Sequence, residues 1–167
     1  NNLLRNASVQ YNGRVVSLAT YNKQSVLVGT YGSGFYSLNT DFSLATAFIS
    51  SSEERDYTRN EPVNNWINSI CPDDSRLWVG TYKGICCFDA EQQRFSVADS
   101  SMQNSIANRI VFDMATDQYN NLWIATNEGV MKYNRDSNSI RTFNTTDGLS
   151  SNTAVAIATD SVGNVWV

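Results

Sequence analysis

The sequence of 167 residues contains no histidine. Histidine is the side chain that most often serves as a general base or a metal ligand near neutral pH, so its absence removes every Ser-His and Cys-His arrangement from this chain. Charge is also scarce, because 17% of the residues are charged and the net charge is −4. A nucleic-acid-binding domain needs a basic patch that neutralises phosphates, so nucleic acid is not expected as a partner.

Long hydrophobic runs are missing as well. No run approaches the ~20 apolar residues that cross a bilayer, and residues 1–5 lack the charged start and apolar middle of a signal peptide. The sequence begins without Met and ends at residues 165–167, inside an apolar run typical of a strand. We therefore expect a soluble fragment of a larger protein whose targeting segments lie elsewhere.

Cysteine and proline are rare, with three and two residues respectively. Cys71, Cys86 and Cys87 are odd in number, show no C-x-x-C spacing and lie in apolar, strand-like runs. Such residues are typically buried small hydrophobic side chains. A disulfide framework or a metal site is therefore not expected.

A repeat runs through the chain. Residues 77–85 align with residues 122–130, more loosely with residues 26–35, and a fourth copy opens at residues 165–167. Trp78 lies 45 residues before Trp123, Trp123 lies 43 before Trp166, and Leu27, the equivalent of tryptophan in the first copy, lies 51 before Trp78. This spacing suits four short strands with their turns.

Within each copy the pattern predicts a four-stranded antiparallel meander. Apolar segments at residues 66–72, 110–116 and 154–159 each precede an Asp-containing turn, at residues 73–76, 117–120 and 160–163. Gly34, Gly84 and Gly129 separate the second strand from the third. No helical periodicity is found. Because a meander cannot bury both faces alone, the copies should stack radially as an all-β propeller fragment of about three and a half blades.

The predicted boundaries follow the repeat. Residues 1–14 are the end of a preceding blade or a tail, residues 15–65 are blade 1 with a long insertion at 50–61, residues 66–108 are blade 2, residues 109–153 are blade 3, and residues 154–167 are the first two strands of a truncated blade 4. Structural roles are expected for the repeated tryptophans, as wedges between blades, and for the repeated threonines and turn aspartates: Trp78, Trp123, Trp166, Thr30, Thr81, Thr126, Asp74, Asp117 and Asp160.

Residues 147–152 and 154–167 resemble the two-component regulator propeller repeat, in which a D-G-L-x-S-N run leads into the inner strand and D-x-x-G makes the next turn. Residues 122–133 resemble its L-W-I-G-T and G-L-x-x-F-D strands. The resemblance covers nearly all of residues 15–167, although the first copy lacks the tryptophan and the turn aspartate.

The resemblance implies a function. Such repeats are typical of the periplasmic sensor region of hybrid two-component histidine kinases of Bacteroidetes, where they precede an immunoglobulin-like domain, a membrane span and a cytoplasmic kinase and recognise glycan breakdown products. The chain would then be a non-catalytic piece of a periplasmic sensor, without a cofactor or a metal, in a parent protein anchored in the inner membrane. A whole propeller of this type has about seven blades, so the candidate partners are the rest of the propeller, an oligosaccharide and a second copy.

Propeller ligands usually enter at the mouth formed by the loops before the inner strands and the loops between the second and third strands. The candidate ligand-binding residues from these loops are Trp66, Arg109, Thr153, Tyr31, Ser33, Tyr82, Lys83, Asn127 and Glu128. Trp66, Arg109 and Thr153 each follow an asparagine and are interpreted as equivalent positions. A tryptophan among polar groups suits a sugar ring, and Arg109 and Lys83 could pair with a carboxylate or sulfate.

Each of these candidates could instead be an ordinary solvated loop residue that binds no ligand. A second candidate patch lies in the insertion, at Arg55, Tyr57 and Arg59, although that insertion could equally be without function.

Two rival functions stay open. A propeller enzyme acting on polysaccharide would need facing carboxylates ~5 to 10 Å apart, whereas the acid pairs Glu53-Glu54 and Asp73-Asp74 are sequence neighbours. Residues 159–166 approach the sialidase S-x-D-x-G-x-x-W box, with the glycine one residue late. A lyase resembling streptogramin lyase would use histidine, which only other blades could supply. The second rival is a protein-interaction scaffold, but the Gly-His and Trp-Asp pairs of WD40 repeats are missing.

Overall fold

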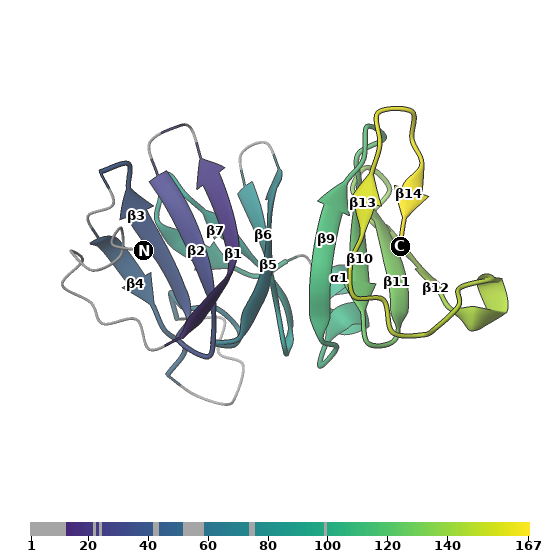
Figure 1. The fold of residues 1–167 in the computed structure, drawn as a ribbon, viewed down its shortest axis with the longest axis horizontal. Helices are drawn as coiled ribbons and strands as arrows, with labels where there is room; N and C mark the ends of the chain where they lie inside the picture. The colour runs from purple at the N-terminus through teal and green to yellow at the C-terminus, as the bar shows by residue number, and fades with distance from the viewer. Residues whose placement is uncertain are drawn as a thin grey trace.

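The fold consists of successive antiparallel sheets. A computed structural model describes residues 13–21, 23, 25–41, 44–51, 59–73, 76–98 and 100–167, which form three four-stranded sheets and a two-stranded one. In each sheet the strands are hydrogen-bonded in chain order. Figure 1 shows the sheets side by side, in the order in which the chain makes them. The all-β propeller fragment with about three and a half blades is confirmed.

The bounds of the strands follow the predicted repeat closely. The first sheet contains β1 (Arg14–Tyr21), β2 (Ser25–Tyr31), β3 (Phe35–Asn39) and β4 (Leu44–Phe48). The second contains β5 (Ile67–Asp73), β6 (Arg76–Thr81), β7 (Gly84–Asp89) and β8 (Arg94–Ser96). The third contains β9 (Val111–Thr116), β10 (Asn121–Thr126), β11 (Gly129–Asn134) and β12 (Ser139–Phe143). The fourth contains β13 (Ala158–Thr159) and β14 (Val165–Trp166). A 3₁₀ turn (Thr145–Asp147) precedes β13.

The core lies between neighbouring sheets. The first and second sheets share one buried cluster, in which four phenylalanines have ring centroids 4.7 to 6.1 Å apart: Phe35, Phe48, Phe88 and Phe95. Trp78 is 1% exposed and packs in a second cluster with the third sheet, so its role as a wedge between blades is confirmed. Trp123 is partly buried among residues of the third and fourth sheets. Trp166 is 62% exposed, and the expectation of a wedge is wrong there.

The repeated threonines close the turn between the second and third strands. Thr81 Oγ1 donates to the carbonyl of Gly84 at 2.9 Å and accepts from the amide of Lys83 at 3.0 Å. The hydroxyls of Thr30 and Thr126 donate to the carbonyls of Gly34 and Gly129 in the same way. All three threonines are fully buried. Each therefore satisfies polar groups that the turn would otherwise leave without a partner, and the predicted structural role is confirmed.

A short helix was not foreseen. α1 (Ser100–Ile106) connects the second sheet to the third, and it buries Met102 and Ile106 four residues apart. Gln103 Nε2 donates to the carbonyl of Ile85, which fixes the helix to β7. The sequence shows no helical periodicity at this segment, because seven residues with two apolar anchors are too few to show a 3.6-residue period.

The fourth copy forms less strand than predicted. A strand was expected at residues 154–159, but within it only residues 158–159 pair, and their partners are residues 165–166. In the register of the third sheet, partners for residues 154–156 would come after Val167, the last residue of the sequence. Ala154 and Ile157 are nevertheless buried, in a cluster that contains Ala125 and Val130 of the third sheet.

The three cysteines are buried, as predicted. Burial raises the pKa of Cys86 to about 12. Burial, with smaller contributions from the negative charges of Asp73 and Asp113, raises the pKa of Cys71 to about 11. Residues 1–12, Asp74, and residues 52–58 of the insertion lie outside the part of the chain that the structure describes. Over the described part, no helix has the length and apolar character needed to span a membrane.

Candidate functional site

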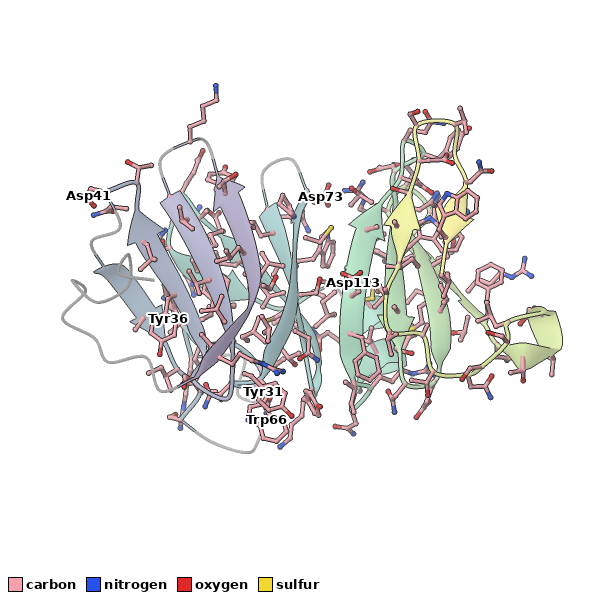
Figure 2. All side chains as sticks on the ribbon, viewed as in Figure 1. Tyr31, Tyr36, Asp41, Trp66, Asp73 and Asp113 are labelled. Carbon is pink, nitrogen blue, oxygen red and sulfur yellow. The ribbon has the colours of Figure 1, made fainter. Side chains whose placement is uncertain are left out.

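The loops before the inner strands and those between the second and third strands meet at one rim. Tyr31 and Trp66 lie together at the lower edge of the sheets in Figure 2, whereas Asp73, the last residue of β5, lies at the opposite edge. Four of the predicted residues, Tyr31, Trp66, Tyr82 and Lys83, come from the first and second sheets. Three more, Arg109, Asn127 and Glu128, belong to the third.

Three aromatic rings meet between the first and second sheets. Tyr31 stacks on Trp66 with ring centroids 4.9 Å apart and an interplanar angle of 21°. Tyr82 meets the edge of this stack, 4.7 Å from the Trp66 ring and 5.9 Å from the Tyr31 ring. The Arg14 guanidinium lies 5.5 Å from the Tyr31 ring centroid, a cation–π distance. Tyr31 and Trp66 remain 38% and 40% exposed, so the cluster is accessible from solvent.

The backbone fixes this cluster. Tyr31 and Trp66 form an isolated antiparallel bridge, and the amide of Tyr82 donates to the carbonyl of Trp66 at 3.1 Å. The amides of Gly32 and Gly34 both donate to the carbonyl of Asn65, at 3.2 and 3.0 Å. Gly32 has φ +94°, and a Cβ there would lie 3.1 Å from Trp66 Nε1. A glycine at this position therefore permits both the turn and the close approach of the indole.

The hydroxyl oxygens of Tyr31 and Tyr82 lie 3.4 Å apart, within hydrogen-bond distance. This hydrogen bond, and to a smaller extent desolvation, raises the pKa of Tyr82 from its ordinary value of 10.0. The Tyr82 hydroxyl is therefore neutral at neutral pH and can act as a donor or an acceptor.

A cavity of about 530 Å³ opens beside the aromatic cluster. Its lining combines two aromatic rings, polar side chains and one cation: Gly32, Ser50, Ser51, Asn64, Asn65, Trp66, Tyr82 and Lys83. Asn65 holds Ser50 on both sides, because its Oδ1 accepts from the Ser50 amide at 2.6 Å and its Nδ2 donates to the Ser50 carbonyl at 2.9 Å. Asn64 Oδ1 accepts from the amide of Trp66 at 2.9 Å. The volume lies within the range of small-molecule sites.

The remaining candidates make contacts of their own, away from Trp66. Arg109 Nη2 lies 3.4 Å from Glu128 Oε2, and Arg109 Nη1 donates to the Glu128 carbonyl at 3.4 Å. Asn127 Oδ1 accepts from the amide of Ile110 at 2.8 Å, which anchors the start of the inner strand. Thr153 is exposed, and its amide donates to Ser151 Oγ. The structure therefore does not bring these four residues into the cavity beside Trp66.

The predicted equivalence of Trp66, Arg109 and Thr153 holds for Trp66 and Thr153 but is wrong by one residue at Arg109. Ile67 pairs with Thr81, and Val111 pairs with Thr126, so Trp66 corresponds to Ile110. The backbone hydrogen bonds support the equivalence of Trp66 and Ile110. The carbonyl of Trp66 accepts from the amide of Tyr82, and the carbonyl of Ile110 accepts from the amide of Asn127. Arg109 instead corresponds to Asn65. The asparagines used as markers misled the alignment, because Asn108 lies before the rim in a left-handed conformation, with φ 65°.

Sequence reasoning missed several residues of the site. Asn64, Ser50 and Ser51 line the cavity, and Arg14 lies on the Tyr31 ring. Arg14, the first residue of β1, occupies the position in the first copy that Trp66 occupies in the second, so a corrected repeat alignment finds it. Ser50 and Ser51 gave no signal, because the insertion has no counterpart in the other copies. Arg59 of the second candidate patch lies 4.0 Å from Glu61, and Arg55 and Tyr57 lie outside the described residues.

The opposite rim has a smaller polar cavity of about 330 Å³. Asp73, Asp117, Asn120 and Arg135 are among its lining residues. Arg135 forms an ion pair with Asp73, and its Nε donates to the carbonyl of Asn120. Asp73 also accepts from Trp78 Nε1 at 2.8 Å. These charges thus join the second sheet to the third, which accounts for the arrangement structurally.

Comparisons with known proteins confirm the resemblance noted in the sequence. The family described as two component regulator propeller matches residues 61–83 and 105–128. Each match ends at the turn between the second and third strands of a sheet and includes the inner strand, so the matched segments carry Trp66, Tyr82 and Lys83 in one copy and Arg109, Asn127 and Glu128 in the next. No curated protein matches the chain significantly.

Solved structures show the same fold. The extracellular domain of the hybrid two component system BT3049 from B. thetaiotaomicron is 21% identical over 96% of this chain and 21% of its own, with a TM-score of 0.74. That of BT4673 from the same organism is 22% identical over 95% of this chain and 20% of its own, with a TM-score of 0.71. The chain thus spans about a fifth of these relatives. The computationally designed Ika4 protein is 11% identical over 94% of this chain and 91% of its own, with a TM-score of 0.63.

Proposed function

We propose that this chain is a non-catalytic sector of an extracytoplasmic sensor propeller in a hybrid two-component system. In this proposal the rim of the propeller binds an oligosaccharide released from a glycan, and the signal passes to a histidine kinase in another part of the parent protein. The family match and the two B. thetaiotaomicron structures support the sensor class. They also favour a Bacteroidetes source, a periplasmic location and a parent protein anchored in the inner membrane.

The cavity beside Trp66 is the observation that carries the sugar-binding part of the proposal. Sugar rings present C–H groups on one face and hydroxyls around their edge. Aromatic side chains pack against the C–H face, and amides or hydroxyls form hydrogen bonds with the sugar hydroxyls. The cavity offers both kinds of group, with Trp66 and Tyr82 next to Asn64, Ser50 and Ser51.

The hydrogen bonds around the cavity favour recognition rather than catalysis. Hydrogen bonds donated by backbone amides hold Trp66, Tyr82 and Asn65 in place before a ligand arrives. This ordering lowers the conformational entropy that is lost on binding. No acidic residue belongs to the described lining of the cavity, so it offers no facing pair of carboxylates for glycoside hydrolysis.

The rest of the propeller is the second partner in this proposal. Leu18 on β1 is 63% exposed, whereas the residues at its position in the next three copies, Ile70, Met114 and Ile157, are 7%, 6% and 6% exposed. Each of those three is covered from the preceding sheet; the amide of Ile70, for example, donates to Ser17 Oγ at 2.9 Å. We therefore expect another blade to cover β1, supplied by the rest of the parent propeller or by a second copy of this chain. Light scattering of the isolated chain distinguishes these sources, because a mass of one chain excludes the second copy.

Thermal unfolding with a panel of oligosaccharides tests the ligand proposal. A ligand that binds only the native state raises the melting temperature by mass action, by an amount equivalent to about 2.7 kcal/mol at a hundred times its Kd. We expect such a shift with the parent protein's extracytoplasmic region, its loss in Trp66→Ala, and its retention in Tyr119→Ala. Tyr119 is a suitable control because it is an exposed aromatic residue in the turn between β9 and β10, at the opposite rim. Absence of a shift with every oligosaccharide, or turnover of one of them, would contradict the proposal.

A further inference from the structure

We propose that Tyr31 is a positioning residue of the cavity beside Trp66, which holds the rings of Trp66 and Tyr82 in place without contacting the sugar itself. This inference rests on the proposed sugar-binding function and identifies a residue that sets the geometry of the site. It depends on three features of the described residues: the contacts of Tyr31, its position in the repeat, and the way in which the two lining rings are held.

The contacts of Tyr31 are with other side chains rather than with the cavity. Its ring stacks on Trp66, the Arg14 guanidinium lies 5.5 Å from its ring centroid, and its hydroxyl lies 3.4 Å from that of Tyr82. The described lining of the cavity includes Trp66 and Tyr82 but not Tyr31. The sequence identifies Tyr31 as a candidate ligand contact, whereas the structure places it one contact away from the cavity, against both of the aromatic rings that line it.

Tyr31 and Tyr82 occupy the same position in consecutive copies. Each directly follows the buried threonine that closes the turn after the second strand. Trp66 connects them, because it forms an isolated bridge with Tyr31 and its carbonyl accepts from the amide of Tyr82. In the third sheet this position is Asn127, whose side chain instead anchors the inner strand. Because the threonines close the turn in all three sheets, the turn itself does not need the tyrosine pair.

The backbone bonds fix the main chain of the two lining rings but not their side-chain torsions, which have several staggered positions. Packing selects among these positions. The Trp66 indole lies against Tyr31 at an interplanar angle of 21° and meets Tyr82 at 81°. Tyr31 also supplies a hydrogen-bond partner for the Tyr82 hydroxyl. An aromatic pair and a hydrogen bond each stabilise one arrangement over the others, so Tyr31 orders both rings before a sugar binds.

Isothermal titration calorimetry on the parent protein's extracytoplasmic region tests this inference. The probes are the disaccharides and tetrasaccharides of glucose, galactose and mannose, in neutral and uronate forms. Tyr31→Phe keeps the ring stack and removes the hydroxyl, so the affinity should fall about two- to tenfold, as loss of one neutral hydrogen bond provides. Tyr31→Ala also removes the stack and should weaken binding by a further factor of about two to ten. Tyr119→Phe is the matched control, because it removes the hydroxyl of an exposed tyrosine at the opposite rim and should leave the affinity unchanged.

A double-mutant cycle distinguishes a positioning residue from a ligand contact. If Tyr31 acts through the Tyr82 hydroxyl, Tyr31→Phe has no further effect on affinity in a Tyr82→Phe background, whereas a direct contact with the sugar makes the two losses add. A second readout needs no ligand. The hydrogen bond between the two hydroxyls is the main cause that raises the pKa of Tyr82 above 10.0, so this pKa should fall toward 10.0 in Tyr31→Phe. NMR of tyrosines labelled at Cζ measures it, and Tyr82→Phe assigns the signal.

The outcomes separate the two proposals. Losses that do not add, together with a lower pKa of Tyr82 in Tyr31→Phe, support the inference. Additive losses, full affinity in both Tyr31 variants, or an unchanged pKa of Tyr82 overturn the inference while the proposed sugar-binding function stands. If none of these sugars binds, the proposed sugar binding at this cavity fails together with the inference.

Discussion

Trp123 Nε1 donates a hydrogen bond to Asp117 Oδ2 at 2.7 Å, across the turn that joins β9 to β10. The same Asp117 carboxylate accepts from the amides of Tyr119 and Asn121, at 2.9 and 3.0 Å. One side chain therefore closes the turn and fixes the indole. The fourth copy repeats the bond between Trp166 and Asp160 at 3.2 Å.

The second copy also has this bond, between Trp78 and Asp73. The sequence had pointed to Asp74 as the turn aspartate. The pairing differs because Trp78 lies five residues after its aspartate, whereas Trp123 lies six residues after Asp117. A turn shorter by one residue thus brings the preceding aspartate to the indole.

Replacement of Asp117 by alanine should destabilise the third sheet. The substitution leaves the Trp123 indole and two turn amides without their acceptor, and loss of such bonds costs about 1 to 3 kcal/mol. Urea unfolding followed by tryptophan fluorescence measures the change. Asp160→Ala is the matched control, because it removes the same set of bonds from the solvent-exposed fourth copy and should cost less. Equal losses at the two sites would contradict the structural role assigned to Asp117.

Stability should fall in acid partly through Asp117. Burial tends to raise the pKa of this carboxyl, but the hydrogen bonds from Trp123, Asn121 and Tyr119 outweigh it and lower the pKa below 3.8. Because the folded pKa is depressed, the stabilisation is complete above the unfolded value and is lost as the pH falls through the folded value. We expect the Asp117→Asn variant to be less stable than the unsubstituted chain at neutral pH and to lose less stability on acidification. If the free energy of unfolding of Asp117→Asn fell as steeply with decreasing pH as that of the unsubstituted chain, the prediction would be refuted.

Gly129 and Gly148 separate the effect of steric overlap from that of backbone conformation. Their φ angles are +106° and +108°, but a Cβ on Gly129 would lie 2.2 Å from the carbonyl oxygen of Phe143, and a Cβ on Gly148 meets nothing within 4 Å. Gly148→Ala should cost about 1 to 2 kcal/mol, for the left-handed conformation alone. Gly129→Ala should cost roughly 3 kcal/mol or more, because β11 and β12 must also move apart. Similar unfolding midpoints for the two variants would show that the backbone at Gly129 relaxes freely.

The cysteines should resist thiol reagents while the protein is folded. The thiolate is the reactive form, and with pKa values of about 12 for Cys86 and about 11 for Cys71 almost none is present at pH 8. Cys87 is also buried. A disulfide reagent should label less than one thiol per native chain within minutes, and all three after unfolding in guanidinium. Rapid labelling of the native chain would show that the second sheet opens readily.

The repeat made most of the fold predictable. The spacing of tryptophans and the glycines between the second and third strands located the strands, because turns and alternating apolar residues are local properties of the chain. The helix at Ser100–Ile106 was not predictable, since its two apolar anchors become meaningful only where the second and third sheets meet. The site was predictable in part. Loop position alone identified Tyr31, Trp66, Tyr82 and Lys83, whereas Asn64 and Ser51 gave no such signal.

What the sequence determined by itself is therefore the blade. Its turns, strand order and buried threonines follow from residues that lie close together along the chain. Tertiary structure decided how one blade meets the next. Asp113 shows this, because its carboxylate accepts from Ser69 Oγ on one side and from the amide of Ile157 on the other, at 3.2 and 3.0 Å. These contacts join residues 44 positions apart. The same holds for the cavity beside Trp66, since Gly32 in its lining belongs to the first sheet and Tyr82 to the second, and only the packing of the two sheets brings these groups together.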